Sequence, residues 1–303
     1  MKFTNRHGLP EEVVSALMKN RYQGDDETQD QRTDFSVSAL VSPTQQTILR
    51  RRYPNCEIPD VIDRVWTLFG HIAHSLLEEH GSEGSITEKR FYLNVLGQNV
   101  SGQIDHLKDR KITDYKTTGA YKIQKGEFNE WSMQLNLYSF LCEENGWPVD
   151  SIRIIAIIRD WSNADYAKNP QSYPKAPIVV LPLVKWSKEV RRKHIEQRVS
   201  LLLANEHAKD DRLPPCTAKE RWMNFRDWAV FKDDNTKATK VFKDINQERE
   251  AIEFAQSKGP NYEVKKRYSP PTRCIGFCNV NSVCHQFKKY LEENANEQEI
   301  AES

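Results

Sequence analysis

The 303-residue sequence contains no apolar run close to the ~18 residues that a membrane-spanning helix needs. Its first residues, MKFTNRHGLPEEVV, lack the apolar stretch of a secretory signal, so we expect a cytoplasmic protein. Net charge is also nearly absent, with 44 Lys and Arg against 43 Asp and Glu. Affinity for nucleic acid would therefore have to come from local basic patches.

Composition divides the chain into three parts. Residues 1–40 are polar and predict a helix followed by a mobile segment. Residues 41–212 alternate helical and strand patterns, as in an α/β core. Residues 213–303 form a C-terminal extension, in which we predict a small ββαβ insert at about 222–268 and an acidic tail.

The core has an identifiable order of elements. A proline after a cap, in Ser42-Pro43-Thr44, predicts a helix start. Apolar residues from Val61 to Leu76 recur at helical spacing and predict a helix that ends near Gly81. Further helices are predicted around Trp131–Leu141 and over 187–208, and strands over 88–96, 100–107, 111–116, 152–158 and 178–184. Pro182 indicates that the last strand lies at a sheet edge.

The segment SGQIDHLKDRKITDYKTT carries the candidate chemistry. Folding it about Asp109 pairs position 105 with about 113, which brings Asp105 and Asp114 onto neighbouring strands. Asp114 and Lys116, two residues apart, point to the same face of their strand. Two carboxylates and an ammonium suit phosphodiester hydrolysis with Mg²⁺ or Mn²⁺. A salt-bridged surface hairpin is the alternative, because acid-x-Lys triplets are frequent in so charged a chain.

The order of the neighbouring motifs adds to this signal. A GxxxH pair (Gly70, His74) precedes the hairpin, GxxD ends at Asp105, DYK spans Asp114–Lys116, and QxxxY (Gln134, Tyr138) follows. This order resembles the RecB-like branch of the PD-(D/E)XK nucleases, which includes CRISPR-associated iron–sulfur exonucleases and phage exonucleases. The similarity spans roughly residues 40–185.

The resemblance implies a restriction-endonuclease-like core, with a central mixed sheet flanked by helices. It also implies DNA hydrolysis with Mg²⁺ or Mn²⁺. The metal ligands it implies are the side chains of His74, Asp105 and Asp114 and the backbone carbonyl of Tyr115. It makes Lys116 the catalytic lysine, makes Gln134 and Tyr138 lining residues of the active site, and gives Glu88 the position of an acidic residue beside the metal.

Three cysteines near the C-terminus, Cys274, Cys278 and Cys284, form a C-x3-C-x5-C pattern that is typical of a metal site. Such sites take four ligands. We prefer Cys216, in LPPCT, as the fourth, with Cys56 and His285 as alternatives. The resemblance favours a [4Fe–4S] cluster, with Zn²⁺ as the alternative, and the site would fasten the tail to the core.

The sequence leaves several functions open. We expect an exonuclease that acts on single-stranded or duplex DNA ends in recombination, repair or phage DNA processing, working with a recombination or single-strand-annealing protein. A restriction-type or junction-resolving endonuclease on the same fold is one alternative, and a non-catalytic DNA-binding or assembly module is another. Arg50–Arg52 and residues 185–198 are candidate phosphate-contacting patches, with a solvated helix face as the alternative for each.

Overall fold

The computed structural model describes residues 3–18, 32–57, 59–79, 84–233 and 235–302, with side chains described for all of these except 74, 76–79 and 295–302. The segment predicted to be mobile thus lies largely outside the described residues. The chain divides into two compact units, one of Met1–Ser42 with Glu57–His207 and one of Pro43–Cys56 with Ala208–Ser303. Within the described residues, no helix combines the length and apolar character that crossing a membrane requires.

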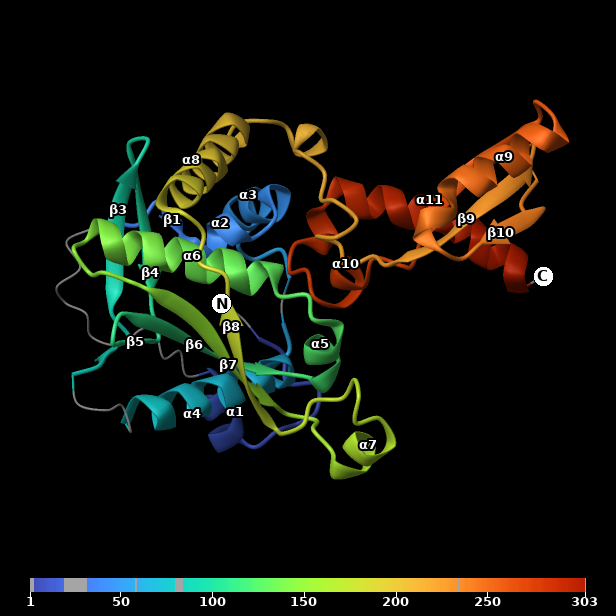
Figure 1. The fold of residues 1–303 in the computed structure, drawn as a ribbon. Coiled ribbons are helices and arrows are strands. Elements are labelled where there is room, and N and C mark those ends of the chain that lie inside the picture. Colours follow the sequence, from blue (N-terminus) through green and yellow to red (C-terminus); the bar gives the residue numbers. More distant parts are fainter. Residues whose placement is uncertain (1–2, 19–31, 58, 80–83, 234, 303) are drawn as a thin grey trace. The chain divides into compact units, whose positions relative to one another are not determined.

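The first unit is an α/β fold whose helices cover both faces of a sheet. The helices are α1 (Glu11–Met18), α2 (Val37–Val41), the 3₁₀ helix η2 (Val61–Arg64), α4 (Val65–Glu79), α5 (Ala120–Lys125), α6 (Asn129–Glu144), α7 (Asn163–Lys168) and α8 (Lys188–Asn205). Helices α4 and α6 lie on opposite faces of the larger sheet (Figure 1). The predicted helices in these regions are confirmed.

The larger sheet has five strands in the order β2-β5-β6-β7-β8. They are β2 (Ile86–Thr87), β5 (His106–Lys108), β6 (Lys111–Thr118), β7 (Ser151–Ile158) and β8 (Ile178–Leu183). Strands β6 and β7 are parallel and the other pairs are antiparallel, so the sheet is mixed as expected. Strand β8 lies at the edge of the sheet, as Pro182 predicted.

A second sheet of the same unit has the order β1-β4-β3, with β1 (Phe35–Ser36), β4 (Gln98–Gln103) and β3 (Arg90–Val95). The strand predicted over 100–107 is therefore broken, because β4 ends at Gln103 and β5 begins at His106 in the other sheet. Glu88, in a left-handed conformation with φ 50°, marks the same break on the neighbouring chain segment. The Glu88 N–H donates to the Asp105 carbonyl at 3.1 Å and joins the two sheets there.

Helix α8 accounts for part of the predicted basic patch at 185–198. Arg191 is 2% exposed and donates to Ser139 Oγ at 2.7 Å and to Glu143 Oε2 at 2.8 Å. Arg198 donates to the backbone carbonyls of Leu40 and Ser42, both at 2.7 Å. The phosphate-contacting role is thus wrong for these two arginines, whose hydrogen bonds lie within the fold, and the buried guanidinium of Arg191 needs such acceptors.

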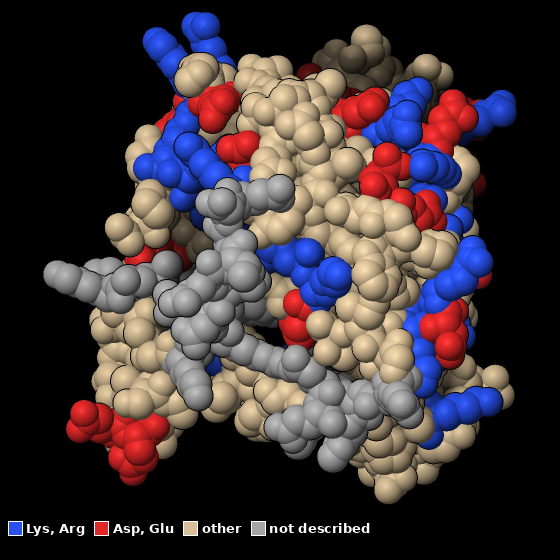
Figure 2. All heavy atoms as spheres, turned by 90° about the vertical axis from the view of Figure 1, so that its left-hand side faces the viewer, with Lys and Arg blue, Asp and Glu red and all other residues tan. Residues whose placement is uncertain are grey.

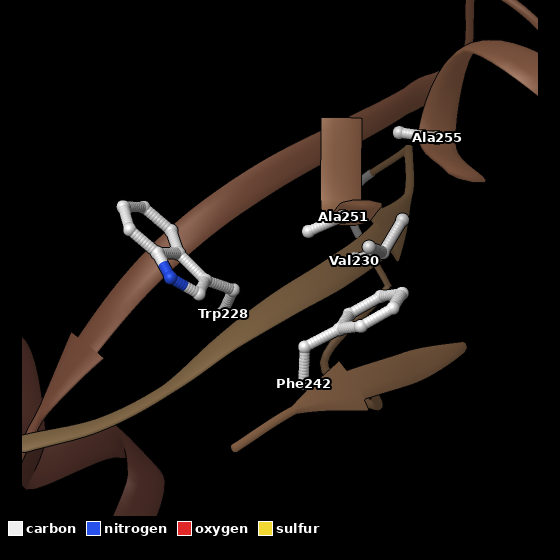
Figure 3. Packing of buried hydrophobic residues seen from close by; sticks show 5 residues of the cluster. All are labelled: Trp228, Val230, Phe242, Ala251 and Ala255. Atoms are coloured by element: carbon white, nitrogen blue, oxygen red, sulfur yellow. The ribbon is translucent and has the colours of Figure 1, made fainter. Parts of the chain in front are cut away.

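The second unit contains the predicted ββαβ insert. Its elements are α3 (Thr44–Arg52), η3 (Asp210–Arg212), β9 (Phe225–Lys232), β10 (Lys240–Phe242), η4 (Ile245–Gln247), α9 (Glu248–Lys258), β11 (Tyr262–Tyr268), α10 (Thr272–Gly276), η5 (Asn281–Val283) and α11 (His285–Glu302). The sheet is antiparallel in the order β10-β9-β11. Helix α9 packs its alanines against Val230 and Phe242, and with Trp228 these residues form the core of the insert (Figure 3).

Candidate active site and cysteine cluster

The turn of the β5–β6 hairpin sets the register of the candidate site. Lys108 pairs with Lys111, and both residues between them, Asp109 and Arg110, have positive φ (47° and 58°). A two-residue turn of this hand matches the twist of antiparallel strands. Because His106 pairs with Thr113, Asp105 lies opposite Asp114 just beyond the last pair, one residue from the predicted register.

Backbone and side-chain contacts then hold both carboxylates. Asp105 Oδ2 accepts a hydrogen bond of 2.8 Å from the Tyr115 N–H, so its carboxylate is fixed against β6. Asp114 is 2% exposed, and its Oδ2 lies 2.7 Å from Lys116 Nζ. That contact is an ion pair, since within the described residues the buried Oδ2 accepts no hydrogen bond of regular geometry. A buried anionic oxygen with so little hydrogen bonding fits a further cation.

The charged groups in the site shift the pKa values of Lys116 and Tyr138. Burial by itself lowers the pKa of Lys116, but attraction to Asp114 and then to Asp105 outweighs burial and raises the pKa above its ordinary value. Burial raises the pKa of Tyr138 to about 12, and the Asp114 charge adds to this effect. Lys116 is therefore an ammonium at neutral pH and Tyr138 a neutral hydroxyl, so both are available as hydrogen-bond donors.

The carboxylates and Lys116 line a cavity of about 270 Å³. The residues around it are Ser36, Val37, Ser38, Glu88, Arg90, Ser101, Gly102, Gln103, Asp105, Asp114, Lys116, Gln134 and Tyr138. The structure thus brings together five predicted site residues, and Gln134 Nε2 donates to Tyr138 Oη at 2.9 Å. Glu88, expected beside the metal, also lines the cavity.

Sequence reasoning missed a polar chain on the wall of this cavity. Arg90 donates to Gln103 Oε1 at 2.8 Å, and Gln103 Nε2 donates to Glu88 Oε2 at 2.7 Å. Arg90 also donates to Ser101 Oγ at 3.2 Å. The sequence does indicate part of this chain, because Ser101 and Gln103 are two residues apart in β4 and their side chains therefore point to the same face of the strand.

Gly102 has a steric role at the site. A Cβ atom placed there would lie 2.8 Å from two carbons of the Tyr138 ring and 2.9 Å from Val37 Cγ2. The GxxD motif therefore carries a glycine because β4 and the Tyr138 ring approach closely. Gly70 has no such need, since its Cβ would meet Thr117 Oγ1 at 3.8 Å, an ordinary contact.

All four metal ligands stay predictions, and for two of them, His74 and Tyr115, only the backbone position bears on the prediction. His74 lies in α4, but its side chain is outside the described residues. Tyr115 lies in β6 between Asp114 and Lys116, and its proposed contribution is its backbone carbonyl. The ring of Tyr115 packs edge-on against His106 with centroids 6.5 Å apart, and burial followed by the Asp105 charge raises its pKa.

In the second unit, the thiols of three cysteines lie near Gln45 and Gln46 in the N-terminal turn of α3. Cys216 Sγ and Cys284 Sγ each lie 3.6 Å from the same atom, Gln45 Oε1. Gln46 Nε2 lies 3.8 Å from Cys278 Sγ. Burial raises the pKa of Cys216 to about 12, and the nearby Glu220 and the thiols of Cys284, Cys274 and Cys278 add to this effect.

The alternative fourth ligands are placed differently. The Cys56 thiol donates to the Asn279 carbonyl at 3.2 Å, and Ser282 Oγ lies 3.5 Å from the Cys56 carbonyl. His285 is exposed. Cys216 thus shares the atom Gln45 Oε1 with Cys284, while Cys56 contacts the residue after Cys278, and the choice of the fourth ligand stays a prediction.

A buried arginine beside the thiols would suit an anionic group at that place. Arg221 Nε and Nη2 are buried and, among the described residues, have no hydrogen-bond partner. The Arg221 charge is close enough to lower the pKa of Cys284, although burial outweighs it and the net direction is upward. Thiolates bound to a metal centre would supply the negative charge that this guanidinium lacks.

As they stand, no three His, Cys, Asp or Glu side chains in the described part of the chain are grouped closely enough to hold a metal ion. The His74 side chain lies outside that part, so the finding bears on the thiols near Gln45 and not on a site that includes His74.

Basic side chains form several groups on the face of the first unit that carries β3 and β4. Figure 2 shows Lys and Arg atoms beside Asp and Glu atoms in the middle of this face. Charge of one sign does not dominate it, as the nearly neutral composition predicts.

Comparisons with known proteins give distant matches in structure alone. Neither protein-family models nor curated proteins match the sequence. The structure named SSO0001 aligns with 63% of this chain and 85% of its own at 15% identity, with a TM-score of 0.42. An alkaline exonuclease from Laribacter hongkongensis aligns with 57% of this chain and 87% of its own at 16% identity, with a TM-score of 0.35. A phage-related exonuclease from Haemophilus somnus 129PT aligns with 68% and 96% at 12% identity, with a TM-score of 0.33.

Proposed function

We propose that this chain is a metal-dependent DNA nuclease that hydrolyses phosphodiester bonds in the cavity around Asp105, Asp114 and Lys116. The observation that carries the proposal is the convergence of two carboxylates and a half-buried ammonium on one cavity, with Asp114 Oδ2 buried and held by the Lys116 ion pair. A structural ion pair on a surface hairpin needs neither the cavity nor the second carboxylate.

Asp105 and Asp114, with His74 and the Tyr115 carbonyl, are the proposed ligands of Mg²⁺ or Mn²⁺. When bound, such an ion neutralises phosphate charge and makes water more acidic. Lys116 remains protonated and can donate a hydrogen bond to a phosphate oxygen as negative charge develops there. The Tyr138 hydroxyl, held by Gln134, can donate to a second oxygen or to water in the same cavity.

The proposed reaction is exonucleolytic, on DNA ends in recombination, repair or phage DNA processing, with a recombination or single-strand-annealing protein as partner. The test uses end-labelled linear single-stranded DNA, linear duplex DNA and closed circular DNA, each with Mg²⁺ or Mn²⁺. We expect mononucleotides or short products from linear substrates and intact circles. Cleavage of the closed circular DNA would show that the protein is an endonuclease. If no substrate is cleaved, the nuclease proposal is overturned.

For the cysteines we propose a [4Fe–4S] cluster held by Cys216, Cys274, Cys278 and Cys284, with Zn²⁺ as the alternative metal. The support is the contact of Cys216, Cys278 and Cys284 with Gln45 and Gln46, and the nearby Arg221, whose buried Nε and Nη2 have no hydrogen-bond partner among the described residues. Anaerobically purified protein should be brown and absorb near ~400 nm if the site holds iron and sulfur. Colourless protein with stoichiometric zinc would favour the alternative. If elemental analysis finds neither iron nor zinc, the proposed metal site is disproved.

A further inference from the structure

A second cavity, of about 490 Å³, lies along β3 next to the candidate active site. It is lined by Lys89, Arg90, Phe91, Tyr92, Leu93, Asn94, Asn99, Asn145 and Trp147. Arg90 lines both cavities, so the second cavity adjoins the first. Strand β3 is the edge strand of its sheet, and consecutive residues of β3 line the cavity, which therefore follows the strand's free edge.

The two cations of this cavity lack counter-charges. Within the described residues, neither Lys89 nor Arg90 forms an ion pair, and the hydrogen bonds of Arg90 go to the neutral Ser101 and Gln103. Two neighbouring unpaired cations attract an anionic ligand, and a polyanion best of all.

An aromatic platform stands beside these cations. The Trp147 ring is half-buried and contacts Phe91 edge-on, with centroids 6.3 Å apart. Lys89 Nζ lies 4.4 Å from the Trp147 centroid and 5.7 Å from that of Phe91. The half-buried Trp147 ring and the Lys89 ammonium thus lie together, and an aromatic ring beside a cation is the pair of groups that contacts an unpaired base and its phosphate in single-strand binding sites.

The free edge of β3 is less suited to a peptide strand. Asn145 Nδ2 donates to the Tyr92 carbonyl at 2.9 Å, which occupies an acceptor that an added strand would need.

We infer that this cavity binds a single-stranded segment of DNA, with a base against Trp147 and phosphates at Lys89 and Arg90. The inference rests on the proposed function, because the strand bound there would lead past Arg90 into the cavity of Asp105 and Asp114. It specifies the substrate of that site, since a base held in a duplex cannot stack on a protein ring.

The test measures binding without cleavage, by fluorescence anisotropy of labelled dT15 and of a 15-base-pair duplex in EDTA. Trp147→Ala should weaken dT15 binding by about 5- to 150-fold, the range that stacking one base spans. Lys89→Gln should reduce the slope of log Kd against log salt by about 0.7, as expected for the loss of one phosphate contact on a single strand. Duplex binding should change much less than dT15 binding in both variants.

Trp66→Ala is the matched control. The Trp66 ring is 55% exposed and has Arg159 4.1 Å from its centroid, yet it lines neither cavity. Trp147→Phe, which keeps a ring against Phe91, guards against misfolding of the alanine variant and should retain most of the affinity. Unchanged dT15 affinity in folded Trp147→Ala and Lys89→Gln, or an equal loss in Trp66→Ala, would overturn the inference.

Failure of this inference and failure of the proposed function are distinguishable. If the wild type cleaves linear DNA and Trp147→Ala binds dT15 normally, the DNA subsite is disproved while the nuclease proposal stands. If Trp147→Ala loses dT15 binding and the wild type cleaves no DNA, the DNA subsite stands while the nuclease proposal is disproved. In an active enzyme, Trp147→Ala should raise KM for single-stranded substrates while kcat stays near the wild-type value.

Discussion

The acid–lysine hairpin of the first unit and the cysteine cluster of the second are held in different ways. In the hairpin, a two-residue turn and a strand ladder place Asp105 beside β6, and the Tyr115 N–H fixes its carboxylate. In the cluster, the thiols come from separate segments and meet at Gln45 and Gln46 of α3. Substitution in the hairpin should therefore remove chemistry without unfolding, whereas substitution in the cluster should loosen the structure.

The largest expected effect is that of Asp114→Asn. The amide keeps the size of the side chain but loses the charge that would hold a divalent cation, so we expect cleavage to fall by at least ~10³-fold with little change in thermal stability. Asp109→Asn, in the exposed turn of the same hairpin, is the matched control and should cleave normally. Residual Asp114→Asn activity above about a few per cent would argue against metal ligation by this carboxylate.

Lys116→Ala should be the next most damaging change. The ammonium is expected to act on charge that develops during the reaction, so turnover should drop by about 10²–10³-fold while DNA binding persists. The check is single-turnover cleavage at saturating Mn²⁺, beside a binding titration. Normal turnover at saturating Mn²⁺, with weaker metal binding, would assign Lys116 to holding the site together instead.

The cluster is tested by Cys216→Ser beside Cys56→Ser. An open ligand position destabilises a four-thiolate site and the segment that it fastens, so Cys216→Ser should lose more than about half of its metal and become protease-sensitive beyond residue 216. Cys56, whose thiol is engaged with the Asn279 carbonyl, should tolerate serine. Metal retained in Cys216→Ser but lost in Cys56→Ser would reverse the assignment.

The smallest effects concern the two motif glycines. Gly102→Ala forces a methyl group against the Tyr138 ring and should destabilise the fold by about 1–3 kcal/mol while slowing cleavage. Gly70→Ala meets an ordinary contact in α4 and should leave stability unchanged or raise it by up to ~1 kcal/mol. Thermal unfolding of the two variants compares them directly, and equal destabilisation would show that Gly70 is also sterically required.

Features set by neighbouring residues could be predicted from the sequence, and features that depend on contacts between distant segments could not. Local signals identified the hairpin, the edge position of β8 and the ββαβ insert, because turns, Pro182 and alternation act within a few residues. The break between β4 and β5 was missed because it depends on the left-handed Glu88 and on pairing between distant segments. The glutamines at the thiols were missed because they join elements far apart in sequence, whereas the polar chain through Arg90 lies on two adjacent strands and could have been found from their alternation.

The most direct test of the central claim is Mn²⁺ binding without DNA, followed by the loss of the free-ion electron paramagnetic resonance signal. If the carboxylates of Asp105 and Asp114 hold the cation, the wild type and Asp109→Asn should bind Mn²⁺ with similar affinity. Asp105→Asn and Asp114→Asn should each bind it at least ~10-fold more weakly. Equal Mn²⁺ affinity in all four proteins would contradict the assignment of this cavity as the metal site.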